Sequence, residues 1–346
     1  MTDNNSLPQQ YKFSEKKVDC FFGQDFSFIG EKLQKAKTVF ITDENLYAAH
    51  AEKFSGWETI VIKAGEQFKN QNTVDSIIAQ LINLHADRQT FIMGIGGGVV
   101  TDIAGFVASI YMRGVKFAFA PTSILAMVDA SIGGKNGIDV GVYKNLVGVI
   151  RQPEFLLYDY SFLETLPDEE WVNGFAEIIK HACIKDREMF YFLQQHSLAK
   201  FQSSLKDAAA IVERNVNIKY NVVANDEQEI GERKLLNFGH TIGHAIENTS
   251  KLPHGHAISI GMYAACKISE AINNFDASET EKIKELLVQY ELPVTFNSSK
   301  EQTWEILLHD KKKSGNNMSF IALDKIGAAS VRSITLDQLH QIFNSI

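Results

Sequence analysis

The chain has 346 residues, of which 45% are hydrophobic and 22% charged, and its formal net charge is −8 at pH 7. This is the composition of an ordinary globular protein, long enough for two domains. The negative charge argues against general binding to nucleic acids or anionic membranes, although a local basic pocket for a small anion stays compatible with it.

The N-terminal segment MTDNNSLPQQYKFSEKK is polar and lacks the apolar core of a signal peptide. No apolar run reaches the length that a membrane-spanning helix needs. The three cysteines, Cys20, Cys183 and Cys266, are widely spaced and include no CxxC pair, so each is expected to be a small buried side chain. These features predict a cytoplasmic enzyme in a reducing compartment.

The first half of the chain alternates strand-like and helix-like segments. Apolar, β-branched runs predict strands at residues 37–43 and 58–65, at QTFIMGIGGG from residue 89 and at KFAFAPTS from residue 116. Helical patterns lie between the first two strands and at about 73–85. Nearly continuous apolar strands that alternate with helices indicate a parallel sheet covered on both faces.

After Pro167 the apolar residues recur at spacings of three and four, which is typical of helices. A strand-like run returns only near the C-terminus, at MSFIALDKIG from residue 318. The predicted fold class is therefore α/β. A Rossmann-like, parallel-sheet nucleotide domain at residues 1–165 precedes a mostly α-helical metal- and substrate-binding domain at residues 166–346.

The segment GIGGGVVTDIAGF places Gly94 and Gly96 to Gly98 between a predicted strand and a predicted helix. Consecutive glycines let the backbone approach an anion closely, and the helix N-terminus adds unpaired N–H groups, as a pyrophosphate requires. The spacing departs from GxGxxG, so a tight strand-to-helix turn is the alternative. Asp43, at the end of the first strand, is placed either to meet a nucleotide or to cap the next helix.

A second group of polar residues follows the strand at KFAFAPTS. Asp129, Lys135, Lys144 and Asn145 stand among glycines and small residues in VDASIGGKNGIDV and YKNLVG. Loops at the carboxyl ends of sheet strands are where α/β proteins bind ligands. The alternative is a solvated loop, and the glycine density favours a binding site.

Four of the ten histidines lie between Leu235 and Met262. His240 and His244 are four residues apart and therefore share one face of a predicted helix, and His254 precedes the next helix. A structural role for such a pair is the alternative to metal binding. A carboxylate would complete an open catalytic metal site. Glu177, in the apolar stretch NGFAEIIKHACI, is the candidate, and His181 is a rival ligand one turn later.

Several long motifs together resemble the 3-dehydroquinate synthase family. They are GGGVVTDIAGFVASIYMRG, PTSILAMVDASIGGKNGID, KNLVGVIRQP, LPDEEWVNGFAEIIKHACI, LLNFGHTIGHAIE and HGHAISIGM, in the family's order from about residue 37 onward. The resemblance implies a carbon–oxygen lyase that cyclises 3-deoxy-D-arabino-heptulosonate 7-phosphate to 3-dehydroquinate with release of phosphate, in the shikimate pathway. It also implies NAD, a divalent metal (zinc, with cobalt as the alternative) and a homodimer.

In that reaction NAD is reduced and then regenerated, so the protein mainly positions and stabilises charge. By position, the resemblance implies Glu177, His240 and His254 as metal ligands, which ranks His181 below Glu177. His244 and Glu229 match proton-handling positions, and the implied catalytic set also includes Lys135 and Arg113.

The resemblance further implies two binding sets. The residues expected to bind substrate are Arg113, Asp129, Lys135, Asn145, Lys180, Lys219, Arg233 and Asn237, with Lys311 or Lys312 at the phosphate. The residues expected to bind NAD are Asp43, Asn45, Glu66, Lys69, Gly97, Gly98, Val99, Val100, Thr101, Asp102, Thr122, Ser123, Lys135, Lys144, Phe162 and Thr165.

One position departs from the family pattern, because His256 stands in HGH where the family usually has HGE. This leaves open whether His254 or His256 coordinates the metal, and motif register favours His254. Related sugar-phosphate cyclases, which use substrates without the carboxylate, are one alternative, and Lys219, Arg233 and Asn237 argue against them. Metal-dependent alcohol dehydrogenases and a catalytically silent relative are the others.

Overall fold

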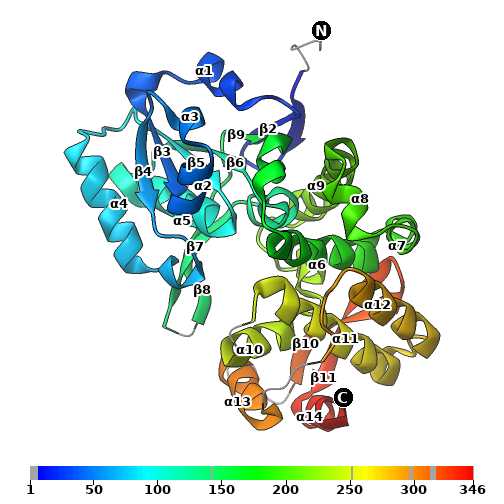
Figure 1. Ribbon diagram of the computed structural model, residues 1–346. Helices are drawn as coiled ribbons and strands as arrows, with labels where there is room; N and C mark the ends of the chain where they lie inside the picture. Colours follow the sequence, from blue (N-terminus) through cyan, green and yellow to red (C-terminus); the bar gives the residue numbers. More distant parts are fainter. Residues whose placement is uncertain (1–6, 142, 251, 296–298, 312–316, 346) are drawn as a thin grey trace. The chain divides into compact units, whose positions relative to one another are not determined.

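The computed structural model describes residues 7–141, 143–250, 252–295, 299–311 and 317–345. The chain forms two compact units (Figure 1). The first unit comprises Met1–Pro167 and Ser204–Glu227, and the second comprises Asp168–Ser203 and Gln228–Ile346. The chain therefore returns to the first unit for one segment after it has entered the second.

The first unit is built on a seven-stranded sheet with the order β1-β2-β9-β6-β5-β3-β4. The strands are β1 (Gln9–Lys12), β2 (Lys17–Phe22), β3 (Thr38–Asp43), β4 (Glu58–Ile62), β5 (Phe91–Gly96), β6 (Lys116–Pro121) and β9 (Phe155–Tyr158). Only the edge strand β1 pairs antiparallel with its neighbour; the other pairs are parallel. The predicted α/β class with a Rossmann-like parallel sheet is confirmed.

Helices cover both faces of this sheet. They are α1 (Ile29–Lys32), α2 (Glu44–Ala49), α3 (Ala51–Phe54), α4 (Gln71–Asn83) and α5 (Gly98–Ile110). Phe40, Met93 and Ala118 of the sheet join a core cluster with residues of α1 and α3 on one face. On the other face Gly94 lies so close to α5 that an added Cβ would stand 2.8 Å from the Ala104 Cβ. The apolar strands are thus buried on both sides, as a parallel sheet requires.

Two further elements complete the first unit. One is the antiparallel hairpin of β7 (Lys135–Val140) and β8 (Tyr143–Ile150), which the apolar periodicity did not predict. The other is α9 (Leu205–Asn225), which the expected boundary at residue 165 assigned to the helical domain. A helical period identifies α9 as a helix, but it carries no information about which core the helix packs against.

The second unit is mostly helical, as expected. Its helices are α6 (Asp168–Lys185), α7 (Arg187–Gln194), α8 (Leu198–Gln202), α10 (His240–Ser250), α11 (His254–Asn273), α12 (Ala277–Gln289), α13 (Lys300–Lys311) and α14 (Leu336–Ser345), and β10 (Asn317–Lys325) pairs with β11 (Ala328–Thr335). Residues 171–184 of α6 are all buried. A helix that is buried on every side forms the centre of a domain, and α6 packs against α11 there.

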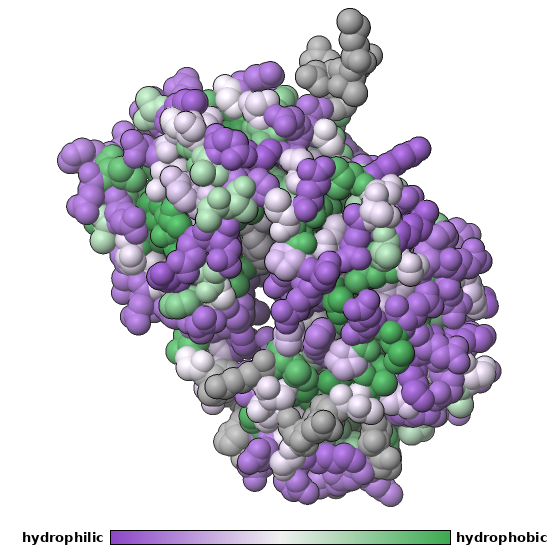
Figure 2. Space-filling model, in the orientation of Figure 1, coloured by the Kyte–Doolittle hydropathy of each residue, from purple (hydrophilic) through white to green (hydrophobic). Residues whose placement is uncertain are grey.

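Hydrophilic residues cover most of the surface seen in Figure 2, and the hydrophobic residues in that view form small groups between them. No helix in the described part of the chain is long and apolar enough to cross a membrane. Cys20, Cys183 and Cys266 are buried thiols, as predicted.

Candidate active site

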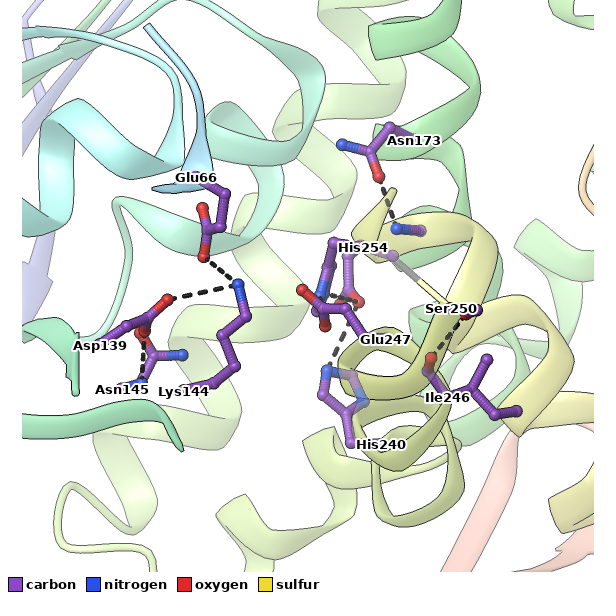
Figure 3. A network of polar contacts seen from close by, with 12 residues as sticks. Glu66, Asp139, Lys144, Asn145, Asn173, His240, Ile246, Glu247, Ser250 and His254 are labelled. Atoms are coloured by element: carbon purple, nitrogen blue, oxygen red, sulfur yellow. Dashed lines mark hydrogen bonds and ion pairs between the residues drawn. The ribbon is translucent and has the colours of Figure 1, made fainter. Parts of the chain in front are cut away.

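Three side chains of the second unit converge at one point. Glu177 comes from the middle of α6, while His240 and His254 are the first residues of α10 and α11. Oε1 of Glu177 lies 3.6 Å from Nε2 of His240 and 3.6 Å from Nε2 of His254. The three donor atoms lie within 4.8 Å of one another, which is close enough for one cation to contact all of them. Figure 3 shows His240 and His254 directed toward the same point.

Close packing of α10 against α11 brings the two histidines together. A Cβ on Gly261 of α11 would collide with the backbone at Gly239 and Gly243, so only glycine permits this approach. Gly239 also has φ +81°, a left-handed conformation that side chains rarely adopt, directly before α10 begins. The glycines in FGHTIGH and SIGM therefore serve helix packing.

Burial and charge give the three residues different protonation behaviour. Glu177 is 0% exposed and forms an ion pair with Lys180, which is 1% exposed and one turn along α6. Burial, together with the Lys180 ammonium, lowers the pKa of His240 well below its ordinary value. Burial also opposes a charge on His254, but Glu177 and Glu247 outweigh it and raise its pKa to about 10.

A second layer of contacts fixes the direction of the imidazole rings. Nδ1 of His254 lies 3.2 Å from Oε2 of Glu247 (Figure 3). Nδ1 of His240 lies 3.1 Å from the Phe238 carbonyl oxygen. In both rings the other nitrogen, Nε2, therefore faces Glu177. Such partners are typical of metal-binding histidines, because they set the tautomer and the ring orientation.

Glu247 was not predicted from the sequence. It lies on α10 three residues after His244 and seven after His240, so helical periodicity places it on their face. Asn173 of α6 was missed as well; its side-chain oxygen accepts a hydrogen bond from the Gly255 N–H and ties the start of α11 to α6 (Figure 3). A short polar residue in an apolar helix gave no signal that could be distinguished from an ordinary buried amide.

The other histidines considered in the sequence, His181, His244 and His256, lie outside this group of three donors. The His244 ring lies 5.1 Å from the His240 ring and 6.1 Å from the His254 ring, measured between centroids, so it borders the cluster. His181 is buried on α6, and the ligand group that contains His240 and His254 contains Glu177 instead. His256 belongs to no such group within the described residues. The geometry thus favours His254 over His256.

One carboxylate and two imidazole nitrogens are a donor set that suits zinc or a similar first-row divalent ion, with coordination positions left for water or substrate. The donor spacing and the inward Nε2 atoms fit such an ion.

In the first unit, the residues expected to bind NAD lie at the carboxyl ends of parallel strands. Asp43 ends β3, Glu66 follows β4, Gly97 and Gly98 follow β5, Thr122 and Ser123 follow β6, and Phe162 and Thr165 follow β9. The carboxyl ends of parallel strands meet at one edge of a sheet, which is where nucleotides bind in such folds.

The glycine loop forms a tight strand-to-helix turn, which the sequence offered as the alternative to a pyrophosphate site. A Cβ at Gly96 would stand 2.6 Å from Val100, so the turn from β5 into α5 admits no larger residue there. The helix begins at Gly98 with Gly97 as its N-cap and without a side-chain cap, which leaves its first N–H groups available to an anion. Val99, Val100 and Thr101 form its first turn.

Beside this loop lies a buried ion pair. Lys69 is 5% exposed and pairs with Asp102 of α5, and its Nζ donates to Oδ1 of Asn145 at 2.6 Å. Burial opposes the charge on Lys69, but Asp102 and Glu66 outweigh it and raise its pKa. Lys69 is therefore positively charged beside the N-terminal part of α5.

Lys144 forms a second, more open network. Its Nζ lies 2.9 Å from Oε1 of Glu66 and 3.3 Å from Oδ2 of Asp139 (Figure 3). Asp139 also accepts a hydrogen bond from the Asn145 backbone N–H at 2.7 Å. The β7–β8 hairpin thereby connects Lys144 and Asn145 to the loop after β4.

Three expected NAD contacts also have structural roles. Asp43 accepts hydrogen bonds from the Asn45 and Leu46 N–H groups, so it caps α2 as the alternative reading proposed. The Phe162 ring lies in the core, so a nucleotide at this point would meet backbone. Thr165 Oγ1 lies 2.7 Å from Nε2 of His50, a residue that the sequence did not single out.

The residues expected to bind substrate form smaller groups within each unit. In the first unit, Nζ of Lys219 lies 2.6 Å from Oδ1 of Asp129. In the second, the Asn237 amide donates to Glu229, and Arg233 is buried in the short helix Glu232–Asn237.

The remaining expected substrate residues lie elsewhere in the chain. Arg113 is exposed and has φ +65°, and Lys135 is exposed at the start of β7. Lys311 ends α13, and Lys312 lies outside the described residues.

Comparison with known proteins identifies relatives over nearly the whole chain. Sequence profiles of the 3-dehydroquinate synthase N-terminal and C-terminal domains match residues 59–173 and 174–313. The 3-dehydroquinate synthase of Clostridium beijerinckii is 40% identical over 321 residues, which cover 89% of this chain and 91% of that protein.

Two solved structures share the fold at 24% identity. A 2-deoxy-scyllo-inosose synthase complexed with carbaglucose-6-phosphate, NAD+ and Co2+ has a TM-score of 0.86 and covers 98% of this chain and 99% of its own. The 2-epi-5-epi-valiolone synthase of Streptomyces hygroscopicus, with NAD+ and Zn2+ bound, has a TM-score of 0.87 and covers 96% and 98%.

Proposed function

The chain belongs to the 3-dehydroquinate synthase family, and on this premise we propose that it converts 3-deoxy-D-arabino-heptulosonate 7-phosphate to 3-dehydroquinate and phosphate. The proposed reaction is a phosphate elimination followed by ring closure, which makes the enzyme a carbon–oxygen lyase of the shikimate pathway. The observation that carries the proposal is a family match that extends through both units.

Glu177, His240 and His254 are the residues that would hold a divalent metal, zinc or cobalt. When bound there, the metal would supply Lewis acidity toward the substrate hydroxyl that is oxidised. The chain contributes the orientation of the donors, because Glu247 and the Phe238 carbonyl fix the two imidazole rings. Lys180, buried beside Glu177, would contribute a positive charge toward an anionic substrate group.

The sheet edge of the first unit would hold NAD, which would supply a hydride acceptor and return the hydride within one turnover. The N-terminus of α5 would bind the pyrophosphate, and Lys69 and Lys144 would contribute positive charge beside it. The glycines at this terminus allow the phosphates to approach the backbone.

Substrate anions need local positive charge in a chain of net charge −8. Lys219, Arg233 and Arg113 would provide it for the carboxylate and the phosphate, with Lys135, Asn145 and Asn237 as hydrogen-bonding partners. His244 borders the metal-binding cluster and would transfer a proton to or from the substrate, with Glu229 as a further proton-handling residue. The enzyme would act in the cytoplasm as a homodimer, as the family resemblance implies.

An assay with the heptulosonate phosphate, NAD and zinc tests this function. Phosphate release and absorbance at 340 nm would be followed together. Stoichiometric phosphate and dehydroquinate without lasting NADH are expected, because the hydride is returned in each turnover. Accumulation of NADH without phosphate would identify a dehydrogenase instead, and turnover only of substrates that lack the carboxylate would identify a related cyclase.

A further inference from the structure

The N-terminal hairpin of β1 and β2 packs against helix α9. Gln9 Nε2 and Tyr11 Oη each donate a hydrogen bond of 2.8 Å to Oδ1 of Asn217. The Tyr11 ring stacks on the Tyr220 ring with a centroid distance of 3.8 Å and an interplanar angle of 9°. One edge strand thus contacts two successive turns of α9.

The contact extends to both sides of these two residues. The Ser14 N–H donates to Glu227 just beyond the end of α9, and Sγ of Cys20 on β2 lies 3.5 Å from Oη of Tyr220. Tyr220 is 1% exposed, so its ring is buried where the hairpin contacts α9. The hairpin therefore restricts both rotation and sliding of α9.

Lys219 projects from another side of the same helix. It is two residues from Asn217, which corresponds to about 200° around an α-helix. Its Nζ lies 2.6 Å from both the backbone oxygen and Oδ1 of Asp129, in the short helix Ala126–Ala130. Lys219 is only 6% exposed, and a buried ammonium is stable only while its counter-oxygens stay in place.

We propose that the β1–β2 hairpin is a positioning element, in which Tyr11 and Asn217 hold α9 so that the Lys219 ammonium stays at Asp129. A lysine side chain has several rotatable bonds, so its ammonium is fixed only as well as the backbone that carries it. A small rotation of α9 would withdraw the ammonium from Asp129. The consequence for substrate binding rests on the proposed function, which gives Lys219 an anionic substrate group.

Competitive labelling of lysines with acetic anhydride, quantified by mass spectrometry, tests the positioning without any need for activity. Lys69 is the internal reference, since it is a buried, ion-paired lysine of the same unit that the hairpin does not hold. Tyr11→Ala and Asn217→Ala are expected to raise the labelling rate of Lys219 about tenfold, and Tyr11→Phe about threefold, because it keeps the ring stack and loses one hydrogen bond.

Gln10→Ala is the matched control, because Gln10 Nε2 bonds Asp19 within the hairpin at 2.8 Å and not α9. It should leave Lys219 labelling unchanged. If Lys219 labelling is unchanged in Asn217→Ala and Tyr11→Phe, or rises only together with that of Lys69, the proposal is wrong.

A kinetic arm separates this proposal from the proposed function. Asn217→Ala and Tyr11→Phe should raise KM for the heptulosonate phosphate several-fold, with the Kd for NAD unchanged. Altered labelling with an unchanged KM would overturn the link to substrate binding. If the wild-type protein releases no phosphate, the proposed function fails, and the labelling result still decides whether the hairpin positions Lys219.

Discussion

The cluster of Glu177, His240 and His254 in the second unit and the network of Lys69 and Lys144 in the first favour ligands of opposite charge. Glu177, His240 and His254 point three electron-donating atoms at one place, so this site favours a cation. Lys69 pairs with Asp102 near the N-terminus of α5, whose first N–H groups favour an anion, and carboxylates balance both Lys69 and Lys144. The cluster is held by well-packed helices, whereas the network joins loops and a hairpin.

This difference indicates where a substitution will reduce ligand affinity or stability most. In the cluster one buried carboxylate faces Nε2 of both imidazole rings and a lysine, whereas Glu247 contacts only Nδ1 of His254, so the loss of Glu177 removes the charge at the shared point. In the network each lysine has more than one oxygen partner, so a lysine that loses one contact keeps another.

Glu177→Gln should have the largest effect, because it removes the anionic ligand and leaves the buried Lys180 ammonium without that charge. We expect metal affinity to fall by more than about 100-fold, since loss of a mere hydrogen-bond partner of a ligand already costs 10–100-fold. Metal content by mass spectrometry would measure this, with His181→Gln on the same helix as the control. Full metal content in Glu177→Gln would remove Glu177 from the ligand set.

Lys69→Met should destabilise the first unit by about 3–5 kcal/mol, because it leaves Asp102 as an uncompensated buried charge. Denaturant unfolding would measure the loss. The double variant Lys69→Met/Asp102→Leu should recover much of it, since both charges are then removed. A double variant as unstable as the single one would mean that packing around Lys69, and not charge, is responsible.

Glu247→Gln should weaken metal binding by about 10–100-fold while the ligands themselves stay in place. The amide keeps a hydrogen-bonding group near Nδ1 of His254 but loses the charge that stabilises this orientation. Calorimetric titration with zinc would measure the change, and Glu270→Gln, which alters a half-buried carboxylate of the same unit paired with Lys267, is the control. Equal affinities in wild type and Glu247→Gln would show that Glu247 does not orient His254.

In chelator, the joint contribution of His240 and His254 to the stability of the protein should be greatest near pH 6.5. Because the folded pKa of His254 is raised to about 10, its contribution is complete below about 6.5 and disappears as pH rises toward 10. Because the folded pKa of His240 is lowered, stability also falls below about 6.5, where unfolded His240 takes up a proton. Each slope is at most about 1.4 kcal/mol per pH unit for one proton. Urea unfolding between pH 6.5 and about 8, below the pH at which unfolded cysteines ionise, should show the alkaline slope in wild type and not in His254→Asn. Above that range the buried thiols, whose pKa values are also raised, add a slope of their own in both proteins.

Lys144→Met should have the smallest effect on stability, below about 1 kcal/mol, because its ion pairs are partly exposed. It should still weaken NAD binding several-fold, through the loss of positive charge at the sheet edge. Fluorescence titration with NAD would measure this. Lys63→Met, which breaks the exposed pair with Glu44, should change neither quantity; equal NAD affinity in both variants would exclude Lys144 from the site.

The sequence was sufficient to predict the parallel sheet, the glycine turn and the helical second unit. The sheet and the helices follow from local periodicity, and the turn follows from the run of glycines. The choice of His254 over His256 came from motif register, and the converging Nε2 atoms agree with it. Periodicity alone left Glu177 and His181 equivalent, since both lie buried on α6.

What the sequence did not predict depends on contacts between distant segments. The location of α9 depends on the contact of Tyr11 with Asn217 and Tyr220. Tyr11 is about 200 residues away from both in the chain, and no local pattern encodes that contact. The Glu247–His254 pair joins α10 to α11 across the turn between them. It cannot be predicted without the angle between the two helices.

The return of α9 to the first unit also has a consequence for synthesis on the ribosome. The N-terminal sheet emerges early, but its partner helix at Ser204–Glu227 follows only after Asp168–Ser203 of the other unit has been made. Until then the hydrophobic surface that Tyr11 and Phe13 present to Tyr220 has no cover from α9. The nascent chain therefore passes through a stage in which part of the apolar surface of its first unit is exposed, a condition that generally favours aggregation.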